Sequence, residues 1–192
     1  MPFSAKHRAG LAARARAEYK LRLLRLVGRR LSWGHKPLFF EGMPILDAKG
    51  EIVFGDDCRI RSGPIRPRLV AAASGRIELG DRVGIGYGVE FYSEQSVVLG
   101  HDTIVGGLVT IYDTSFHPLE EGRPVKVKPV EIGANVWIGR GATILAGTTI
   151  GDHAVIAAGS IVHGDIAART LAAGNPAKPI RELTASDDWH RV

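Results

Sequence analysis

A histidine and several acidic side chains gather in the segment 112–131, and residues of these types can carry out proton transfer. His117 precedes Pro118, whose ring fixes the local backbone. A neutral imidazole can take a proton from a hydroxyl group near pH 7, where its pKa makes it effective. We therefore predict that His117 is a general base. The sequence does not choose which acid orients its ring, and the candidates are Asp113, Glu120, Glu121 and Glu131.

Other kinds of chemistry find little support in the sequence. Cys58 is the only cysteine, so the chain can form neither an internal disulfide nor a cysteine metal cluster. His101 and His117 have no third histidine at a suitable spacing, and we predict no metal site. The run GIGYG at 84–88 belongs to a repeat and is not a nucleotide-binding loop.

The segment 112–131 interrupts a six-residue repeat. An aliphatic residue recurs at every sixth position from Ile132 to Val162, and the same spacing leads from Leu99 to Ile111. A period of six fits a short strand and a tight turn, and three such units make a triangular coil that stacks on the next at about 4.8 Å. The predicted fold class is mainly β, a left-handed parallel β-helix, which is an exception to the right-handed crossover rule.

Two breaks in the register locate the irregular parts of this helix. Leu79 and Leu99 are twenty residues apart, one coil plus two, which predicts a small bulge near residues 94–96. Leu99 and Ile132 are thirty-three residues apart, so fifteen residues must leave the coil as a loop. An excursion of this kind usually serves binding or catalysis. The predicted acceptor contacts beside these breaks are Tyr92, Glu94 and Asp113.

The net charge of +5 is concentrated at the N-terminus. Residues 1–36 hold ten Lys or Arg and one acid, whereas the rest of the chain holds fifteen bases and nineteen acids. Residues 5–31 are typical of an amphipathic helix, with Leu21, Leu24 and Leu31 near one stripe. We favour packing of this stripe on the body or on a neighbouring subunit. Peripheral contact with an anionic membrane surface is the alternative.

These patterns divide the chain into three parts. We expect a basic helical arm at 1–43, a β-helix domain at 44–182 with the loop 112–131 extruded, and a short tail at 183–192. No apolar run approaches the roughly 20 residues of a membrane span, and arginines interrupt any secretory signal. We therefore expect a cytoplasmic protein, and we expect no nucleic acid partner.

Four features in sequence order carry a resemblance to a known family: the hexads, His117-Pro118, VWIG at 136–139 and AGNPAK at 173–178. With them the chain resembles the hexapeptide-repeat acyltransferase family, in its maltose/galactoside O-acetyltransferase-like branch, over residues 45–182. The resemblance implies a homotrimer with active sites between subunits and no metal. It also implies acetyl transfer from acetyl-CoA to a hydroxyl of a sugar, a glycosylated metabolite or a polysaccharide.

The same resemblance assigns residues to the donor. Arg140 and Ala158 match positions along the pantetheine arm, and His163 and Gly164 follow along the same edge. Lys178 and Arg181 match a basic pair near the nucleotide phosphates, where cations stabilise binding. Two alternatives stay open. One is an N-acetyltransferase for an amino sugar, and the other is a non-catalytic trimeric scaffold that keeps the coil and lacks the reaction.

Overall fold

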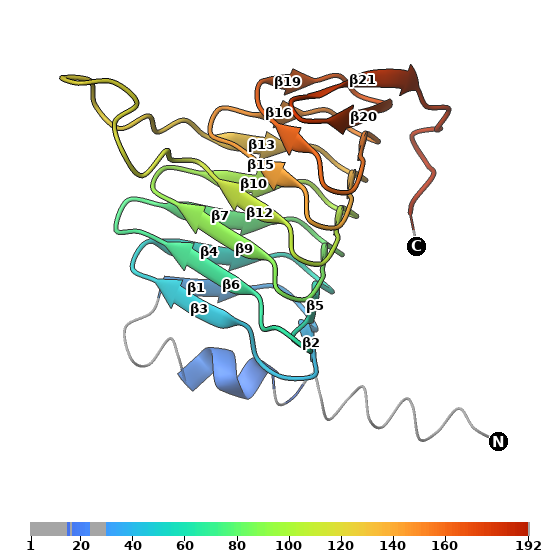
Figure 1. Cartoon of the computed structure of the whole chain (residues 1–192). Coiled ribbons are helices and arrows are strands. Elements are labelled where there is room, and N and C mark those ends of the chain that lie inside the picture. Colours follow the sequence, from blue (N-terminus) through green and yellow to red (C-terminus); the bar gives the residue numbers. More distant parts are fainter. Residues whose placement is uncertain (1–14, 16, 24–29, 192) are drawn as a thin grey trace.

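The computed structural model describes residues 15, 17–23 and 30–191, and the strands form a three-sided parallel column (Figure 1). Each side is one sheet, and each strand except the last pairs with the strand three places away in the sequence, whereas the last strand pairs antiparallel with the strand before it. This order is what a triangular coil requires, because the chain visits the three sides in turn. The repeat therefore folds as its period predicts.

The three sheets have the following strands. The seven-stranded sheet contains β1 (Arg30–Trp33), β4 (Glu51–Phe54), β7 (Arg76–Leu79), β10 (Val97–Leu99), β13 (Val130–Ile132), β16 (Thr149–Ile150) and β19 (Asp165–Ile166). The eight-stranded sheet contains β2 (Leu38–Phe40), β5 (Arg59–Arg61), β8 (Gly84–Ile85), β11 (Ile104–Val105), β14 (Trp137–Ile138), β17 (Val155–Ile156), β20 (Thr170–Gly174) and β21 (Ala177–Glu182). The six-stranded sheet contains β3 (Ile45–Ala48), β6 (Arg68–Ala71), β9 (Glu90–Ser93), β12 (Thr110–Tyr112), β15 (Thr143–Ile144) and β18 (Ile161–Val162).

The aliphatic residue of each hexad fills the inside of the column. Ile132 stands beside Ile150 in the next coil, and Ile138 stands beside Ile156. All four side chains are at most 3% exposed. Burying such a side chain contributes roughly 1.5–3 kcal/mol. The register breaks also fall where the sequence predicts them, because Leu79 pairs with Leu99 and Leu99 pairs with Ile132.

Three edges join the sheets. The first edge leads from the seven-stranded to the eight-stranded sheet, the second from the eight- to the six-stranded sheet, and the third from the six- to the seven-stranded sheet. Turns stack closely along them. A Cβ atom on Gly139 would lie 2.5 Å from the backbone nitrogen of Ala158 one coil away, so only glycine fits there.

The long loop leaves the column at the third edge, between β12 and β13 (Figure 1). Its two arms are joined near their base by an antiparallel bridge between Thr114 and Val127. Two further backbone bonds pair Ser115 N–H with the Lys126 carbonyl and Lys128 N–H with the Asp113 carbonyl. The excursion therefore begins as a paired extension of the third edge, formed by residues 113–115 and 126–128.

The N-terminal part departs from the prediction. Residues 15 and 17–23 are helical, and Leu21 is fully buried against the column, which agrees with the favoured packing. The predicted helix over 5–31 is wrong at its end, because β1 starts at Arg30 and pairs with β4. Residues 1–14, 16 and 24–29, Leu24 included, lie outside the described part of the chain.

The boundary between arm and β-helix moves for the same reason. Strands β1 and β2 occupy part of the predicted arm 1–43, and β2 pairs with β5. Leu31 and Phe39 point into the shared core, so burial in the first coil overrides the helix propensity of the sequence. Within the described residues no helix is long and apolar enough to cross a membrane.

Candidate active site

The root of the loop is fixed by one buried carboxylate. Asp113 is completely buried, and its Oδ2 accepts hydrogen bonds from Ser93 Oγ at 2.8 Å and from the N–H groups of Gln95 at 2.8 Å and Ser96 at 2.7 Å. Its Oδ1 accepts the N–H of Glu94 at 2.8 Å. These bonds hold the bulge at 94–96. We therefore assign Asp113 a structural role in place of the predicted acceptor contact, because no face of its side chain is open.

An aromatic cluster stands beside this root. The Phe116 ring lies 4.8 Å from the Tyr92 ring and 5.1 Å from the Tyr112 ring, measured between centroids. Phe116 has a positive φ of 59°, a conformation that costs a bulky residue about 1–2 kcal/mol. Packing of its ring on the two tyrosines offsets this cost. The cluster thus fixes the backbone of the residue immediately before His117.

Tyr112 connects the cluster to the face of the six-stranded sheet. Its hydroxyl donates to Glu90 Oε2 at 2.9 Å, and Glu90 Oε1 accepts from Arg68 at 3.2 Å. Partial burial, and then the hydrogen bond to Glu90, raise the pKa of Tyr112 to about 12. The phenol therefore stays protonated at neutral pH and acts as a fixed donor.

His117 itself is exposed. Its backbone N–H donates to the Ser115 carbonyl at 2.7 Å, and its own carbonyl accepts from Ser115 Oγ at 2.8 Å. Its ring has no hydrogen bond to any residue that the structure describes. Of the four acids predicted as orienting candidates, Asp113 is committed elsewhere and Glu120 lies 3.8 Å from Arg123. The backbone of His117 is thus held tightly while its imidazole faces outward.

The predicted donor residues fall into separate groups. Arg140 and Ala158 occupy turns of successive coils on the second edge, where the Arg140 carbonyl accepts the N–H of Gly159. His163 and Gly164 follow β18 on the third edge. The expectation that these two pairs share an edge is therefore wrong, because β18 lies between them. They flank one strand of the six-stranded sheet.

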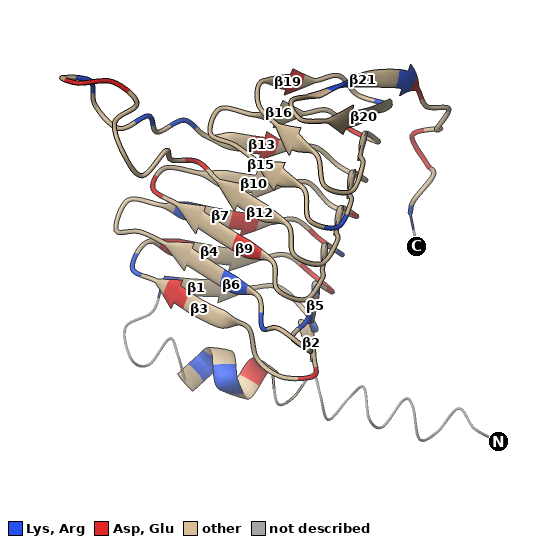
Figure 2. Ribbon diagram, in the orientation of Figure 1, with Lys and Arg blue, Asp and Glu red and all other residues tan. Residues whose placement is uncertain are grey.

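Lys178 and Arg181 lie on β21, which forms an antiparallel hairpin with β20 at the end of the eight-stranded sheet. Both side chains are exposed, and Figure 2 shows basic residues at the end of this hairpin. Figure 2 also shows that the loop carries both acidic and basic residues and reaches away from its own column. Tyr92 and Glu94, the remaining predicted acceptor contacts, are half-buried at the third edge close to the loop root.

Several contacts between side chains in this structure were not predicted from the sequence. Tyr112 lies over Tyr92, and Arg82 forms two 2.6 Å hydrogen bonds with Asp102. The members of each pair are twenty residues apart, as are Leu79 and Leu99. That shared spacing is a signal that could have found both pairs. His101 bonds to Asp102 on the first edge, so it lies away from the loop of His117.

A family model described as "Bacterial transferase hexapeptide (six repeats)" matches residues 129–164. A lipopolysaccharide biosynthesis protein of Escherichia coli (strain K12), named WbbJ and described as a putative O-acetyl transferase, is 34% identical over 145 residues. The match covers 69% of this chain and 72% of WbbJ. This chain belongs to the hexapeptide-repeat acetyltransferase family. Its column is the left-handed parallel β-helix of that family.

Other members of the family give the same picture. The galactoside O-acetyltransferase of Escherichia coli (strain K12) is 32% identical over 126 residues, which are 64% of this chain and 62% of that protein. The chain thus spans about six-tenths of the length of several curated relatives that it matches. The crystal structure of the polySia specific acetyltransferase NeuO aligns with a TM-score of 0.61 and 27% identity, over 86% of this chain and 88% of that one.

Proposed function

We propose that this member of the family is an acetyl-CoA-dependent O-acetyltransferase that modifies a hydroxyl group of a sugar or glycan, with His117 as the general base. The observation that carries the proposal is the loop root. An outward-facing imidazole stands there on a backbone fixed by Ser115, the aromatic cluster and the buried Asp113. The names of WbbJ, the galactoside enzyme and NeuO support a saccharide acceptor.

The proposed reaction is a direct transfer. His117 removes the proton of the acceptor hydroxyl while the oxygen attacks the thioester carbonyl carbon. A new C–O bond forms, the C–S bond breaks, and the departing thiolate takes up the proton from the imidazolium. A backbone N–H of the coil stabilises the negative oxygen of the tetrahedral intermediate. The reaction needs neither a metal nor a covalent acyl-enzyme.

The donor would contact residues from all three groups described above. Lys178 and Arg181 supply positive charge for the phosphates of coenzyme A, and Arg140, Ala158, His163 and Gly164 flank the pantetheine arm. In one chain these residues lie on different sides of the column from one another, while the loop extends outward. We therefore propose a homotrimer in which the loop of one subunit completes the site of its neighbour. Light scattering should give three times the chain mass of 20.6 kDa.

The experiment compares the variant His117→Ala with the control variant His35→Ala. His35 is an exposed histidine at the far end of the column. Coenzyme A release from acetyl-CoA is followed with a thiol reagent, with a galactoside, a lipopolysaccharide glycan and an oligosialic acid as acceptors. Burial raises the pKa of the Cys58 thiol to about 12, so the native protein adds little background. His117→Ala should lower kcat by about 10²–10⁴-fold with little change in the KM for acetyl-CoA.

The outcomes separate the proposal from its rivals. Normal turnover by His117→Ala would remove this residue from the mechanism. A product that resists alkaline hydroxylamine, which cleaves oxygen esters, would be an amide, and the protein would then be an N-acetyltransferase. Failure to release coenzyme A with any acceptor, together with a stable trimer, would favour the scaffold alternative.

A further inference from the structure

The segment 185–191, which we call the strap, lies along the first edge of the column. Arg169 holds its start, because the Arg169 Nε donates to the Ala185 carbonyl at 2.9 Å and the guanidinium pairs with Asp187. Its far end reaches Asp102, where His190 Nδ1 lies 3.2 Å from Oδ2. The strap thus contacts turns of four successive coils, which contribute Asp102, Asn135, His153 and Arg169.

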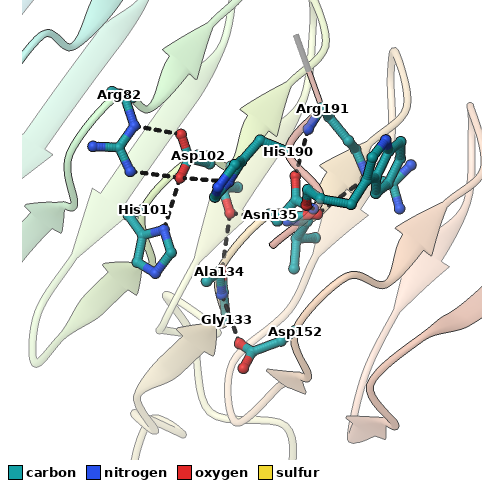
Figure 3. A network of polar contacts seen from close by, with 12 residues as sticks. Arg82, His101, Asp102, Gly133, Ala134, Asn135, Asp152, His190 and Arg191 are labelled. Atoms are coloured by element: carbon teal, nitrogen blue, oxygen red, sulfur yellow. Dashed lines mark hydrogen bonds and ion pairs between the residues drawn. The ribbon is translucent and has the colours of Figure 1, made fainter. Parts of the chain in front are cut away.

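Asn135 recognises the backbone of the strap (Figure 3). Its Nδ2 donates to the Trp189 carbonyl at 2.6 Å, and its Oδ1 accepts the Arg191 N–H at 2.8 Å. The side chain is 1% exposed and its φ is 52°, a left-handed conformation that asparagine adopts more readily than most residues. Lys36 adopts the same conformation at an equivalent turn, so Asn135 is distinguished by its side-chain amide, which binds the strap through both its nitrogen and its oxygen.

The Arg191 side chain adds three contacts. Its Nε donates to the Asn135 carbonyl at 3.1 Å, its Nη2 donates to the His153 carbonyl at 2.9 Å, and its guanidinium lies 4.7 Å from the Trp189 ring. These contacts satisfy backbone carbonyls of two different coils. The strap is therefore bound to the edge by specific hydrogen bonds and is joined to more than one coil.

Asp102, which contacts the far end of the strap, is itself held by several hydrogen bonds (Figure 3). The Asp102 side chain is 8% exposed, and its carboxylate accepts two bonds from Arg82 and one from His101 Nδ1 at 2.8 Å, in addition to its contact with His190. Hydrogen bonds from Arg82 lower the pKa of this carboxyl to about 2. It therefore stays ionised and offers the strap a fixed negative charge.

The stacked shape of the fold leaves the end of the column with few contacts to hold it. In a stack of coils each unit contacts only its neighbours, so the last unit can open without disturbing the rest. The last unit here is the β20–β21 hairpin, which carries Lys178 and Arg181. The Leu183 N–H, just after the hairpin, donates to the Arg169 carbonyl at 2.7 Å, and the Arg169 side chain holds the start of the strap, so Arg169 contacts both segments.

We infer that the strap ties this terminal hairpin to the inner coils and so positions Lys178 and Arg181, with Asn135 as the positioning residue. The contacts of the strap cross several coil interfaces, which nearest-neighbour packing cannot do. The tie between the strap and the hairpin does not depend on which reaction the protein catalyses. Its effect on the acetyl donor rests on the proposed function.

Three variants of the full-length protein test the inference by amide hydrogen exchange and steady-state kinetics. Asn135→Gly keeps the left-handed backbone and removes the amide that binds Trp189 and Arg191, and deletion of residues 185–192 removes the strap. Lys36→Gly is the matched control, because Lys36 has a φ of 54° at an equivalent turn several coils away. The first two variants should exchange amides of residues 170–183 at least fivefold faster, the factor of one hydrogen bond of typical net strength. The control should not.

The kinetic arm uses acetyl-CoA and its analogue without the 3′-phosphate. We expect both strap variants to raise the KM for acetyl-CoA more than the KM for the analogue, with a small change in kcat. Unchanged exchange in 170–183 after the deletion would overturn the inference, and the deletion gives this answer even if Asn135→Gly fails to fold. Faster exchange with unchanged KM values would leave the structural tie intact and would instead count against the proposed phosphate contacts.

Discussion

Replacing Asp113 by asparagine distinguishes a structural acid from an acceptor contact. The two side chains have nearly the same shape, so Asp113→Asn creates no cavity. The four groups that the carboxylate binds are all donors. An asparagine has one carbonyl oxygen for them, and its NH₂ group faces at least one donor. In its better orientation the oxygen keeps the three donors on Oδ2, and the N–H of Glu94 is left without an acceptor.

The expected loss of stability can be worked from these bonds. A hydrogen bond to a charged group contributes about 1.5–3 kcal/mol, and the bonds that remain weaken because their acceptor is no longer ionised. We expect the free energy of unfolding to fall by about 3 kcal/mol. Urea unfolding at one fixed protomer concentration measures it, because the stability of an oligomer depends on concentration. Glu94→Gln is the control and should leave stability unchanged, because it retains the backbone N–H that Asp113 binds.

The kinetic result completes the test. If Asp113 only supports the bulge and the loop root, Asp113→Asn should lower kcat through displacement of His117 and leave the KM for a saccharide acceptor nearly unchanged. A change in stability below about 0.5 kcal/mol, combined with a large increase in the acceptor KM, would refute the reasoning. Asp113 would then be an acceptor contact, as the sequence alone predicts.

Three further predictions concern other parts of the chain. Asp102→Asn should lower the free energy of unfolding by about 2 kcal/mol at pH 7, because Arg82 depresses the folded pKa of this carboxyl from 3.8 to about 2. This difference should shrink in urea titrations as the pH falls below about 4 and should be lost below about 2, and a difference of undiminished size at pH 2 would contradict it. Phe116→Gly suits the positive φ of this position but removes the aromatic ring. The variant should therefore have a kcat about 10–100-fold lower, and trypsin should cleave it faster after Lys126. An unchanged kcat would show that the aromatic cluster does not position His117. Lys178→Ala should raise the KM for acetyl-CoA by no more than about tenfold, because the Lys178 side chain is exposed. The KM for the analogue without the 3′-phosphate should rise less, and equal increases in both KM values would exclude contact with that phosphate.

The sequence determines the β-helix because its signal is local and repeated. Inward residues such as Ile138 and Ile144 recur at a fixed interval, and the same interval sets the pairing of successive coils. Changes in that interval are equally readable, which is why the bulge at 94–96 and the extruded loop were both predictable. The place of His117 at the root of the loop follows from the same arithmetic.

The N-terminus shows where local signals fail. The composition of residues 5–31 favours helix throughout, but Leu31 enters the first coil because burial against the column is worth more than a propensity difference of a few tenths of a kcal/mol. Leu21 keeps the predicted amphipathic role within the helix. Whether a residue of this segment joins the helix or the first strand depends on a surface formed by residues far along the chain. A short stretch of sequence does not contain that information.

The roles of the individual polar residues depend on contacts between distant parts of the chain. Asp113 and Glu94 are both acids that the sequence predicts as acceptor contacts, yet one carboxylate is enclosed by donors from the preceding coil and the other is half-buried at the surface. Asn135 binds residues more than fifty positions away, and its partner at 189 lies in a tail without periodic pattern. Hydrogen bonds of this kind depend on direction and distance within about an ångström, and those are properties of the assembled column that residue spacing does not encode.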